Sequence, residues 1–338
     1  MARRIRSTAP ARMDLAGGTL DIYPLYLFEE YGLTVNAAIN YGSEVIVEER
    51  DDRRVVLRAL DINASAEAEC ISDVCLDGDL SLLARVTRHY LKDFDRGVNI
   101  STRNRAPKGS GLGASSCLII TMSGALLHLL GKEPNHYEMV NLASHLEAQI
   151  IRIPTGKQDY YPAAFGGVNA LWFEPGQDRV EPLGDAARQE LNDRVVLSYT
   201  GVSHFSALSN WLMIKRYIDD SDHARSNMAA IKQIAQAMYD CIKNGDWRAF
   251  ADQVDEEWRF RKGLATGVTT THIDTMMESA KLAGAYSSKI CGAGGGGCMI
   301  TVVPPDKRAA VCEAIQAEGG QILDYEVQAQ GLTVEDID

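Results

Sequence analysis

The chain has 338 residues, of which 46% are hydrophobic and 24% are charged, and its formal net charge is −12. This composition is typical of a globular protein, and the length favours two domains over one. The negative charge argues against a nucleic-acid-binding function, because nothing would offset the repulsion from a phosphate backbone.

Alternating apolar residues in the first hundred positions predict strands at residues 5–9, 34–39, 44–49, 55–60 and 98–102, with a helix at 80–91. Two helices follow, one that opens at Gly113 and one from residue 135 to about residue 151. The segment 153–159 contains proline and glycine, which predicts a break and the start of a short new helix before a strand at 168–173.

The Glu-Pro-Gly-Gln-Asp segment at residues 174–178 is the best candidate for a domain boundary, and we predict domains at 1–175 and 176–338. Beyond it, the pattern predicts a strand at 194–200, helices at 204–217, 224–243, 247–262 and 273–283, strands at 289–291 and 298–303, a helix at 307–318 and a last strand at 325–330. Strands and helices mix in both halves without regular βαβ alternation. This favours an α+β fold over a doubly wound sheet.

The seven cysteines form no Cys-x-x-Cys pair, and no histidine pairs with a cysteine at the spacing of a zinc site. This pattern is typical of reduced thiols. The N-terminal residues do not resemble a signal peptide, and no apolar run approaches the roughly 20 residues that span a bilayer. We therefore expect a cytoplasmic protein that binds neither nucleic acid nor membrane. The amphipathic region 224–262 would serve a homodimer as easily as a core.

The most informative segment is a glycine-serine loop between the strand at 98–102 and an apolar helix. It consists of Pro107, Lys108, Gly109, Ser110, Gly111, Leu112, Gly113, Ala114, Ser115 and Ser116. Glycines let a backbone approach a phosphate, and the amides and dipole of a helix N-terminus attract an anion. The serine hydroxyls can hold a phosphate oxygen or a metal ion. The loop is neither a Walker A motif nor a dinucleotide fingerprint, so it predicts another kind of phosphate cradle, with a simple capped helix as the alternative.

A second motif lies near the N-terminus, where a strand runs into Gly17-Gly18 between Arg12 and Asp21. Arginine is permanently charged and binds phosphate or carboxylate with two parallel hydrogen bonds. Aspartate accepts hydrogen bonds from the neighbouring hydroxyls of a polyol. A tight hairpin with a surface ion pair is the alternative interpretation.

A third motif places five glycines in the six positions 292–297, between two apolar strands. Each glycine costs roughly 0.5–1 kcal/mol relative to alanine in a regular element. Such a loop usually exists because another backbone or a ligand must come close. A flexible linker is less consistent with the apolar strands on both sides.

These three motifs, in this order from residue 8 to residue 298, resemble those of the GHMP kinases, the superfamily of galactokinase, homoserine kinase, mevalonate kinase and phosphomevalonate kinase. Residues 107–116 are similar to the family's Pro-x-x-x-Gly-Leu-Gly-Ser-Ser loop, with Ala114 in place of its first serine. The resemblance implies a two-domain α+β fold, with ATP and the acceptor bound in the cleft between the domains.

The resemblance also implies roles for individual residues. Ser115 and Glu147 would bind Mg²⁺, and residues 107–116 would bind the phosphates of ATP. Asp159 would orient the acceptor hydroxyl and take its proton, and Arg12 would stabilise the developing charge. Whether Asp159 is a true base or mainly a positioning group is left open. For the acceptor we expect contacts from Thr19, Asp21, Tyr23, Gly156, Lys157, Gln158, Gly294 and Gly295.

Two segments resemble one branch of the family. Residues 16–21, Ala-Gly-Gly-Thr-Leu-Asp, are similar to the sugar kinases that include heptose-7-phosphate kinase and the fucokinase-type domains. Residues 158–167 are similar to the heptose kinase segment Gln-Asp-Gln-Tyr-Ala-Ala-Thr-Phe-Gly-Gly, although Lys157 departs from the glycines usual before it. We therefore expect an ATP- and Mg²⁺-dependent kinase for a hydroxyl of a sugar or sugar phosphate, with the anomeric hydroxyl as one candidate. The alternatives are a mevalonate-pathway kinase, an ATP-dependent decarboxylase of the diphosphomevalonate type and a non-catalytic relative.

Overall fold

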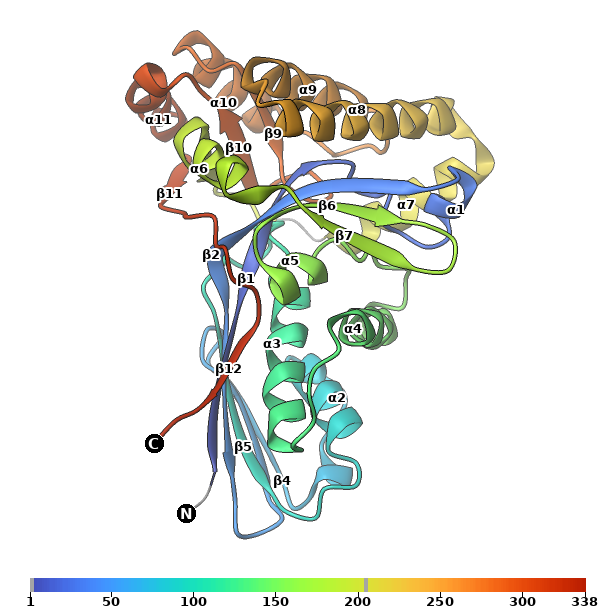
Figure 1. The fold of residues 1–338 in the computed structure, drawn as a ribbon, viewed down its shortest axis with the longest axis vertical. Coiled ribbons are helices and arrows are strands. Elements are labelled where there is room, and N and C mark those ends of the chain that lie inside the picture. Colours follow the sequence, from blue (N-terminus) through green and yellow to red (C-terminus); the bar gives the residue numbers. More distant parts are fainter. Residues whose placement is uncertain (1–2, 204–205) are drawn as a thin grey trace.

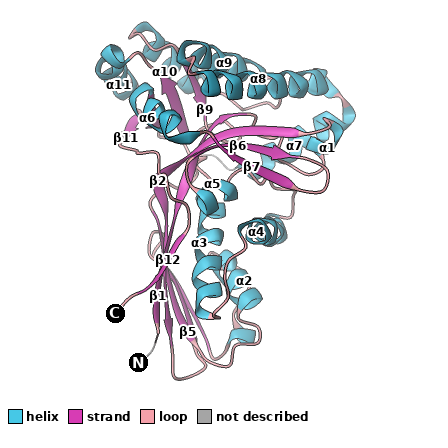
Figure 2. Cartoon of the chain, viewed as in Figure 1, coloured by secondary structure: helices cyan, strands magenta, loops and turns pink. Residues whose placement is uncertain are grey.

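The computed structural model describes residues 3–203 and 206–338, in which helices and mainly antiparallel strands are mixed (Figures 1 and 2). The larger sheet contains eight strands: β1 (Arg4–Ala16), β2 (Gly32–Glu49), β3 (Val55–Ala59), β4 (Ala64–Ala68), β5 (Val98–Asn104), β6 (Val168–Phe173), β7 (Asp178–Pro182) and β12 (Thr333–Asp336). The strand order is β12-β1-β2-β5-β3-β4, and β6 pairs with both β2 and β7. Within the described residues, only β3 and β5 pair in parallel, which confirms the predicted α+β class.

The smaller sheet has the order β11-β8-β10-β9 and consists of β8 (Val195–Tyr199), β9 (Ser287–Ile290), β10 (Cys298–Val302) and β11 (Gln321–Leu323). The helices are α1 (Leu25–Phe28), α2 (Ser81–Tyr90), α3 (Ala114–Leu129), α4 (His136–Ile151), α5 (Tyr160–Phe165), α6 (Gly184–Arg194), α7 (Ser206–Asp219), α8 (Ala224–Asn244), α9 (Trp247–Arg261), α10 (Thr271–Leu282) and α11 (Arg308–Ala317). Three short 3₁₀ turns lie at Ile71–Asp73, Ser221–His223 and Pro305–Lys307.

The long strands β1 and β2 connect the two ends of the molecule. Figure 1 shows both running from the end that carries the chain termini up to the helices α8 and α9. The strands predicted at 34–39 and 44–49 are one strand, β2, which pairs with β6 at its start and with β5 at its end. Gly42 permits this continuity, because a Cβ there would lie 1.8 Å from the carbonyl oxygen of Ala9.

Helix α3 is the central element behind the glycine-serine loop. Its sequence is apolar on all sides, as expected of a helix buried all round, and it packs between β1, β2 and the helices α2, α4 and α5. This packing fixes the N-terminus of α3, and with it the loop at 107–116, beside the middle of β1.

Three clusters of buried apolar residues stabilise the fold. The first lies between the larger sheet and helices α2 to α5. The second joins β1, β2 and β6 to β8, β10, α8 and α9, and the third lies between the smaller sheet and α7, α9, α10 and α11. The second cluster therefore packs one half of the chain directly against the other.

The segment at 174–178 is the turn between β6 and β7, so the larger sheet extends to Pro182. The chain also returns to this sheet at its end, where β12 pairs with β1. The division at residue 175 stays a prediction, but the sheet itself does not end there. Among the described residues, no helix combines the length and the apolar character that crossing a bilayer requires.

Several element predictions need correction. The strand predicted at 325–330 is wrong: only Val327 forms a bridge, to Ile39, and the strand follows at β12. The pattern missed the short elements α1, β4, β7 and β11, whose few residues carry little periodicity. It also missed the 11-residue helix α6, which is mostly polar and whose buried residues are Ala187 and Leu191. For the helix predicted at 204–217, residues 204 and 205 lie outside the described residues, and α7 begins at Ser206.

Candidate active site

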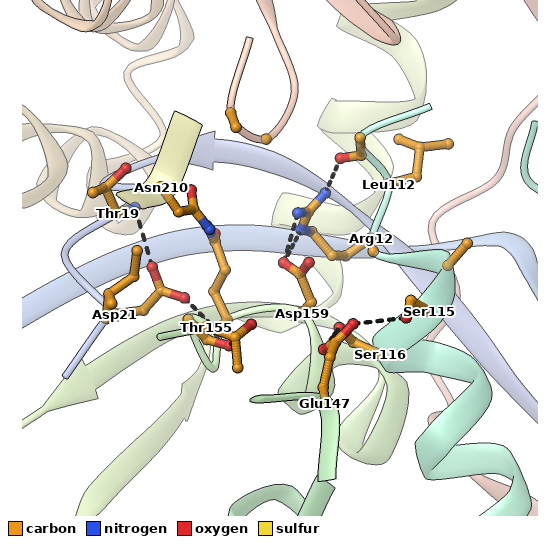
Figure 3. Close-up of a pocket in the computed structure, with 18 of the residues that line it drawn as sticks. Arg12, Thr19, Asp21, Leu112, Ser115, Ser116, Glu147, Thr155, Asp159 and Asn210 are labelled. Carbon is orange, nitrogen blue, oxygen red and sulfur yellow. Dashed lines mark hydrogen bonds and ion pairs between the residues drawn. The ribbon is translucent and has the colours of Figure 1, made fainter. Parts of the chain in front are cut away.

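A cavity of about 300 Å³ lies where segments from both halves of the chain meet. Its walls come from the loop at 107–116, the turns at 17–22 and 155–159, and the C-terminal residues Asn210, Arg261, Gly292 and Ala293. We call Ser115, Ser116 and Glu147 the serine side of the pocket, and Thr19, Asp21, Thr155 and Asn210 the Asp21 side. Figure 3 shows the pair formed by Arg12 and Asp159 between these two sides.

The loop at 107–116 curves into the N-terminus of α3. Gly109, Gly111 and Gly113 have φ angles of 69°, 72° and 72°, a left-handed conformation that glycine adopts without strain. A Cβ at Gly111 would lie 2.5 Å from the carbonyl oxygen of Cys291, so the loop passes directly against the third glycine motif. Helix α3 begins after Gly113 without a side-chain cap. Its first amides therefore face the pocket as an anion-binding helix terminus.

Glu147 is the carboxylate on the serine side. It comes from α4, and its Oε1 accepts a hydrogen bond of 2.6 Å from Ser115 Oγ. Its Oε2 accepts a bond of 3.1 Å from Ser116 Oγ and a second bond from the hydroxyl of Tyr160. Burial raises the pKa of Glu147 above its ordinary value, although these hydroxyl donors act in the opposite direction. The packing of α4 against α3 thus brings together the two predicted metal ligands, Ser115 and Glu147.

Arg12 and Asp159 form an ion pair at the centre of the pocket. Arg12 Nε and Nη2 lie 2.8 and 2.6 Å from Asp159 Oδ1, and the backbone amide of Arg12 donates to the carbonyl of Leu112. The Arg12 side chain is buried, whereas the Asp159 side chain is 25% exposed. A Cβ at Gly113 would lie 2.9 Å from the Cβ of Asp159, which shows how closely the carboxylate approaches the loop. Asp159 therefore lies next to the place where the loop would hold a phosphate.

Asp21 connects the N-terminal turn to the turn at 155–159. Its carboxylate accepts hydrogen bonds from the amides of Thr19, at 3.1 Å, and Gln158, at 2.9 Å. A Cβ at Gly156 would lie 1.9 Å from Asp21 Oδ2, so only glycine fits there. Burial raises the pKa of Asp21 to about 6, and the negative charges of Asp159 and Asp14 add to the effect. Thr19, Gly156 and Gln158, which are among the residues predicted to contact the acceptor, also line the cavity.

Other predicted residues do not line this cavity; they are Tyr23, Pro107, Lys108, Lys157, Gly294 and Gly295. Tyr23 is 62% exposed. Lys157 donates through Nζ to Asp178 Oδ2 at 3.1 Å and faces a second, separate hollow. Gly294 and Gly295 lie against Val268, and Gly292 and Ala293 are the residues of that motif that reach the cavity.

Sequence reasoning missed Arg261, which lines the cavity from α9. Its Nη2 donates to the carbonyl of Gly18 at 2.9 Å and to Glu257 Oε1 at 2.7 Å. Glu257 Oε2 accepts a bond of 2.6 Å from Lys289 Nζ, which also lies 3.2 Å from Asp14 Oδ2. These residues form a buried four-charge cluster of Asp14, Glu257, Arg261 and Lys289, with exposures of 0–1%.

Two signals in the sequence indicate this cluster. Glu257 and Arg261 stand at i,i+4 on a helix, and Lys289 is a single charge within a strand that is otherwise apolar or small. Burial alone would raise the pKa of Asp14, but the charges of Lys289 and Arg261 outweigh it and hold the pKa below its ordinary value. Asn210, another missed residue, is an uncharged position on α7 that carries no such signal.

The sequence matches two family models, one in each half of the chain. Residues 81–167 match the model described as GHMP kinases N terminal domain, and residues 237–321 match GHMP kinases C terminal. The chain is also 30% identical over 336 residues to D-glycero-alpha-D-manno-heptose 7-phosphate kinase of Campylobacter jejuni, with 98% of each chain covered. The chain belongs to the GHMP kinase family. It is therefore a phosphotransferase, and GHMP kinases use ATP.

Other members of the family are similar along their whole length. This GHMP kinase is 25% identical over 349 residues to mevalonate kinase of Pyrococcus furiosus, with 99% of each chain covered. The crystal structure of a D-glycero-D-manno-heptose 1-phosphate kinase from Bacteroides thetaiotaomicron matches with a TM-score of 0.80 at 28% identity, over 99% of both chains. Galactokinase of Lactococcus lactis, complexed with galactose, matches with a TM-score of 0.78 at 19% identity, over 98% of this chain and 95% of that one. The predicted family, fold class and enzyme class are confirmed.

Proposed function

We propose that this GHMP kinase transfers the γ-phosphoryl group of ATP to a hydroxyl of a sugar or sugar phosphate. Heptose 7-phosphate is the first candidate acceptor, and its anomeric hydroxyl is the first candidate position. The observation that carries the proposal is the place of Asp159, between the serine side and the Asp21 side of one pocket. The similarity to the Campylobacter jejuni heptose 7-phosphate kinase supports this class of acceptor.

The residues present fit a nucleotide and a magnesium ion. The left-handed glycines Gly111 and Gly113 let the loop lie directly against Cys291 and Asp159, where a Cβ would collide. The hydroxyl of Ser115 and the carboxylate of Glu147 are oxygen ligands of the kind that Mg²⁺ prefers. Among the described residues, no group of three or more His, Cys, Asp or Glu side chains could hold a metal alone. This suits Mg²⁺, which often binds through one or two carboxylates together with the phosphates of a substrate. When bound, MgATP supplies the phosphoryl group and the charge neutralisation that its transfer requires.

The residues of the pocket have separate roles in this transfer. Ser115 and Glu147 hold the cation, and the amides at the start of α3 hold phosphate oxygens. Asp159 accepts the proton of the acceptor hydroxyl or orients that hydroxyl toward the phosphoryl group. Arg12 fixes the direction of the Asp159 carboxylate through its ion pair and places a permanent positive charge beside the phosphoryl oxygens.

The acceptor occupies the Asp21 side. Both oxygens of Asp21 already accept backbone hydrogen bonds, so this carboxylate shapes the wall and has only its remaining lone pairs for sugar hydroxyls. Lys157 is held by Asp178 outside the cavity, so we assign it no acceptor contact. Among the described residues, the cationic side chains of the lining are Arg12 and Arg261. A phosphate carried by the acceptor would therefore meet Arg261.

A screen of ADP release tests the proposal. The purified enzyme with MgATP is offered heptose 7-phosphate, unphosphorylated heptose, galactose, fucose and mevalonate, and the phosphorylated position of the product is read by ³¹P NMR. We expect turnover with a sugar or sugar phosphate and loss of that turnover in Asp159→Ala. Turnover with mevalonate alone would replace the proposal by the mevalonate kinase alternative, and carbon dioxide release from diphosphomevalonate would indicate a decarboxylase. Full activity of Asp159→Ala would remove Asp159 from the mechanism.

A further inference from the structure

Tyr160 touches the serine side of the pocket, yet no role has been assigned to it. Its side chain is fully buried in the core between the larger sheet and α2 to α5. Its hydroxyl donates a hydrogen bond to Glu147 Oε2. A buried tyrosine hydroxyl usually needs a hydrogen-bond partner, and a neutral acceptor would satisfy it. Here the partner is instead the carboxylate that the proposed function assigns to Mg²⁺.

The two oxygens of Glu147 have different partners. Oε2 accepts from Tyr160 and from Ser116 Oγ at 3.1 Å, whereas Oε1 accepts from Ser115 Oγ at 2.6 Å. The two donors on Oε2 hold the carboxylate at its buried edge. Oε1 therefore remains on the side of Ser115, the hydroxyl with which it would share the cation.

Tyr160 also follows Asp159 directly and begins the short helix α5. Asp159 is fixed on its other side by the ion pair with Arg12. The peptide that joins Asp159 to Tyr160 is thus anchored at two points, to Arg12 through one side chain and to Glu147 through the other. The dipeptide Asp159-Tyr160 therefore links Glu147 on the serine side of the pocket to the Arg12–Asp159 pair at its centre.

We propose that Tyr160 is a positioning residue for the magnesium ligand Glu147. This inference rests on the proposed function. Partners that hydrogen-bond to a metal ligand orient it, and their loss typically weakens metal binding by roughly 10–100-fold. Removal of one hydroxyl from a carboxylate that keeps two other donors falls at the lower end of this range.

The test is Tyr160→Phe, which removes only the hydroxyl. We expect the Mg²⁺ concentration for half-maximal activity to rise about tenfold, with the KM for the acceptor and kcat at saturating Mg²⁺ changed by less than about twofold. A second measurement does not depend on turnover: Mn²⁺ binding in the presence of a non-hydrolysable ATP analogue, followed by electron paramagnetic resonance. It should weaken by a similar factor.

The neighbouring Tyr161 supplies a matched control. It is also buried and donates to a carboxylate, Asp178, at 2.5 Å, but Asp178, unlike Glu147, does not line the cavity. Tyr161→Phe should lower the melting temperature without changing the metal requirement. An unchanged metal requirement in Tyr160→Phe, or equal changes in both variants, would overturn the inference. Should Tyr160→Phe not fold, Ser116→Ala removes the other donor to the same oxygen, and unchanged Mn²⁺ binding in that variant would overturn it as well. A wild-type enzyme that neither binds nor turns over MgATP would instead refute the proposed function.

Discussion

Lys289→Met is expected to destabilise the fold, because it removes a buried positive charge. The ammonium group of Lys289 is fully buried and donates to Asp14, to the carbonyl of Leu15 at 3.1 Å and to Glu257. Methionine retains most of the length and volume of lysine but has no charge. The substitution leaves Asp14 and Glu257 with only Arg261 as compensation within the cluster, so that the cluster's charge changes from zero to −1.

Breaking a buried ion pair by removal of one partner typically costs about 3–5 kcal/mol, because a charge remains without compensation. A natural domain is stable by only about 5–15 kcal/mol, so this loss is a large share of the total. With an unfolding entropy of roughly 2.1 cal/mol/K per residue, 338 residues give about 0.7 kcal/mol/K. The melting temperature should therefore fall by about 4–7 °C.

Urea unfolding followed by tryptophan fluorescence and circular dichroism measures this change. The double variant Lys289→Met/Glu257→Gln restores the charge balance and should recover about half of the lost stability, because residues of one network do not act additively. Because Glu257 accepts from the amide of Gly17 and Arg261 donates to the carbonyl of Gly18, the single variant should also raise the KM for the acceptor. A loss below about 1 kcal/mol, or strict additivity of the two substitutions, would refute the electrostatic argument.

Three further predictions concern the pocket. Asp159→Asn should lower kcat by about 10²–10⁴-fold with little change in the KM for ATP, and steady-state kinetics showing less than a tenfold loss would contradict a role in proton transfer. Gly111→Ala should raise the KM for ATP at least about tenfold, because alanine in the left-handed conformation costs about 1–2 kcal/mol and its Cβ collides with Cys291. Gly131→Ala is the matched control: its φ is also left-handed, at 66°, but the space around it is open, so it should leave the KM for ATP unchanged. Burial raises the pKa of Asp21 to about 6 from 3.8, so the folded chain binds more protons than the unfolded chain in this window and loses stability as the pH rises through it. Asp21→Asn should therefore gain up to ~3 kcal/mol relative to the wild type between pH 4 and pH 7, as measured by urea unfolding, and a pH-independent difference would contradict the raised pKa.

The family, the fold class and most of the long elements could be predicted from the sequence, because they depend on local chemistry. The left-handed glycines at 109, 111 and 113 and the apolar helix after them form a recognisable unit within 25 residues. Long helices such as α8 and α9 carry several turns of periodic pattern. Short elements such as β7 and β11 do not, and their positions depend on the strands with which they pair.

Lys157 shows where local reasoning stops. Its position, two residues before Asp159, indicated an acceptor contact, but the charge is taken up by Asp178 on β7, a strand that the sequence pattern did not reveal. Conversely, Arg261 stands 243 residues from Gly18 and still reaches its carbonyl. No periodicity or motif spacing in the sequence indicates a contact between residues so far apart.

The sequence by itself determined the family, and it predicted a phosphate loop at 107–116, Ser115 and Glu147 as magnesium ligands, and catalytic roles for Arg12 and Asp159. The tertiary structure decided which side chains hold those groups in place. Tyr160 and Glu147 meet because α4 and α5 both pack against α3, and the four-charge cluster forms because α9 and β9 cover the turn after β1. Both arrangements depend on buried polar groups that must find partners, and in a folded chain those partners are set by packing in space and not by distance along the sequence.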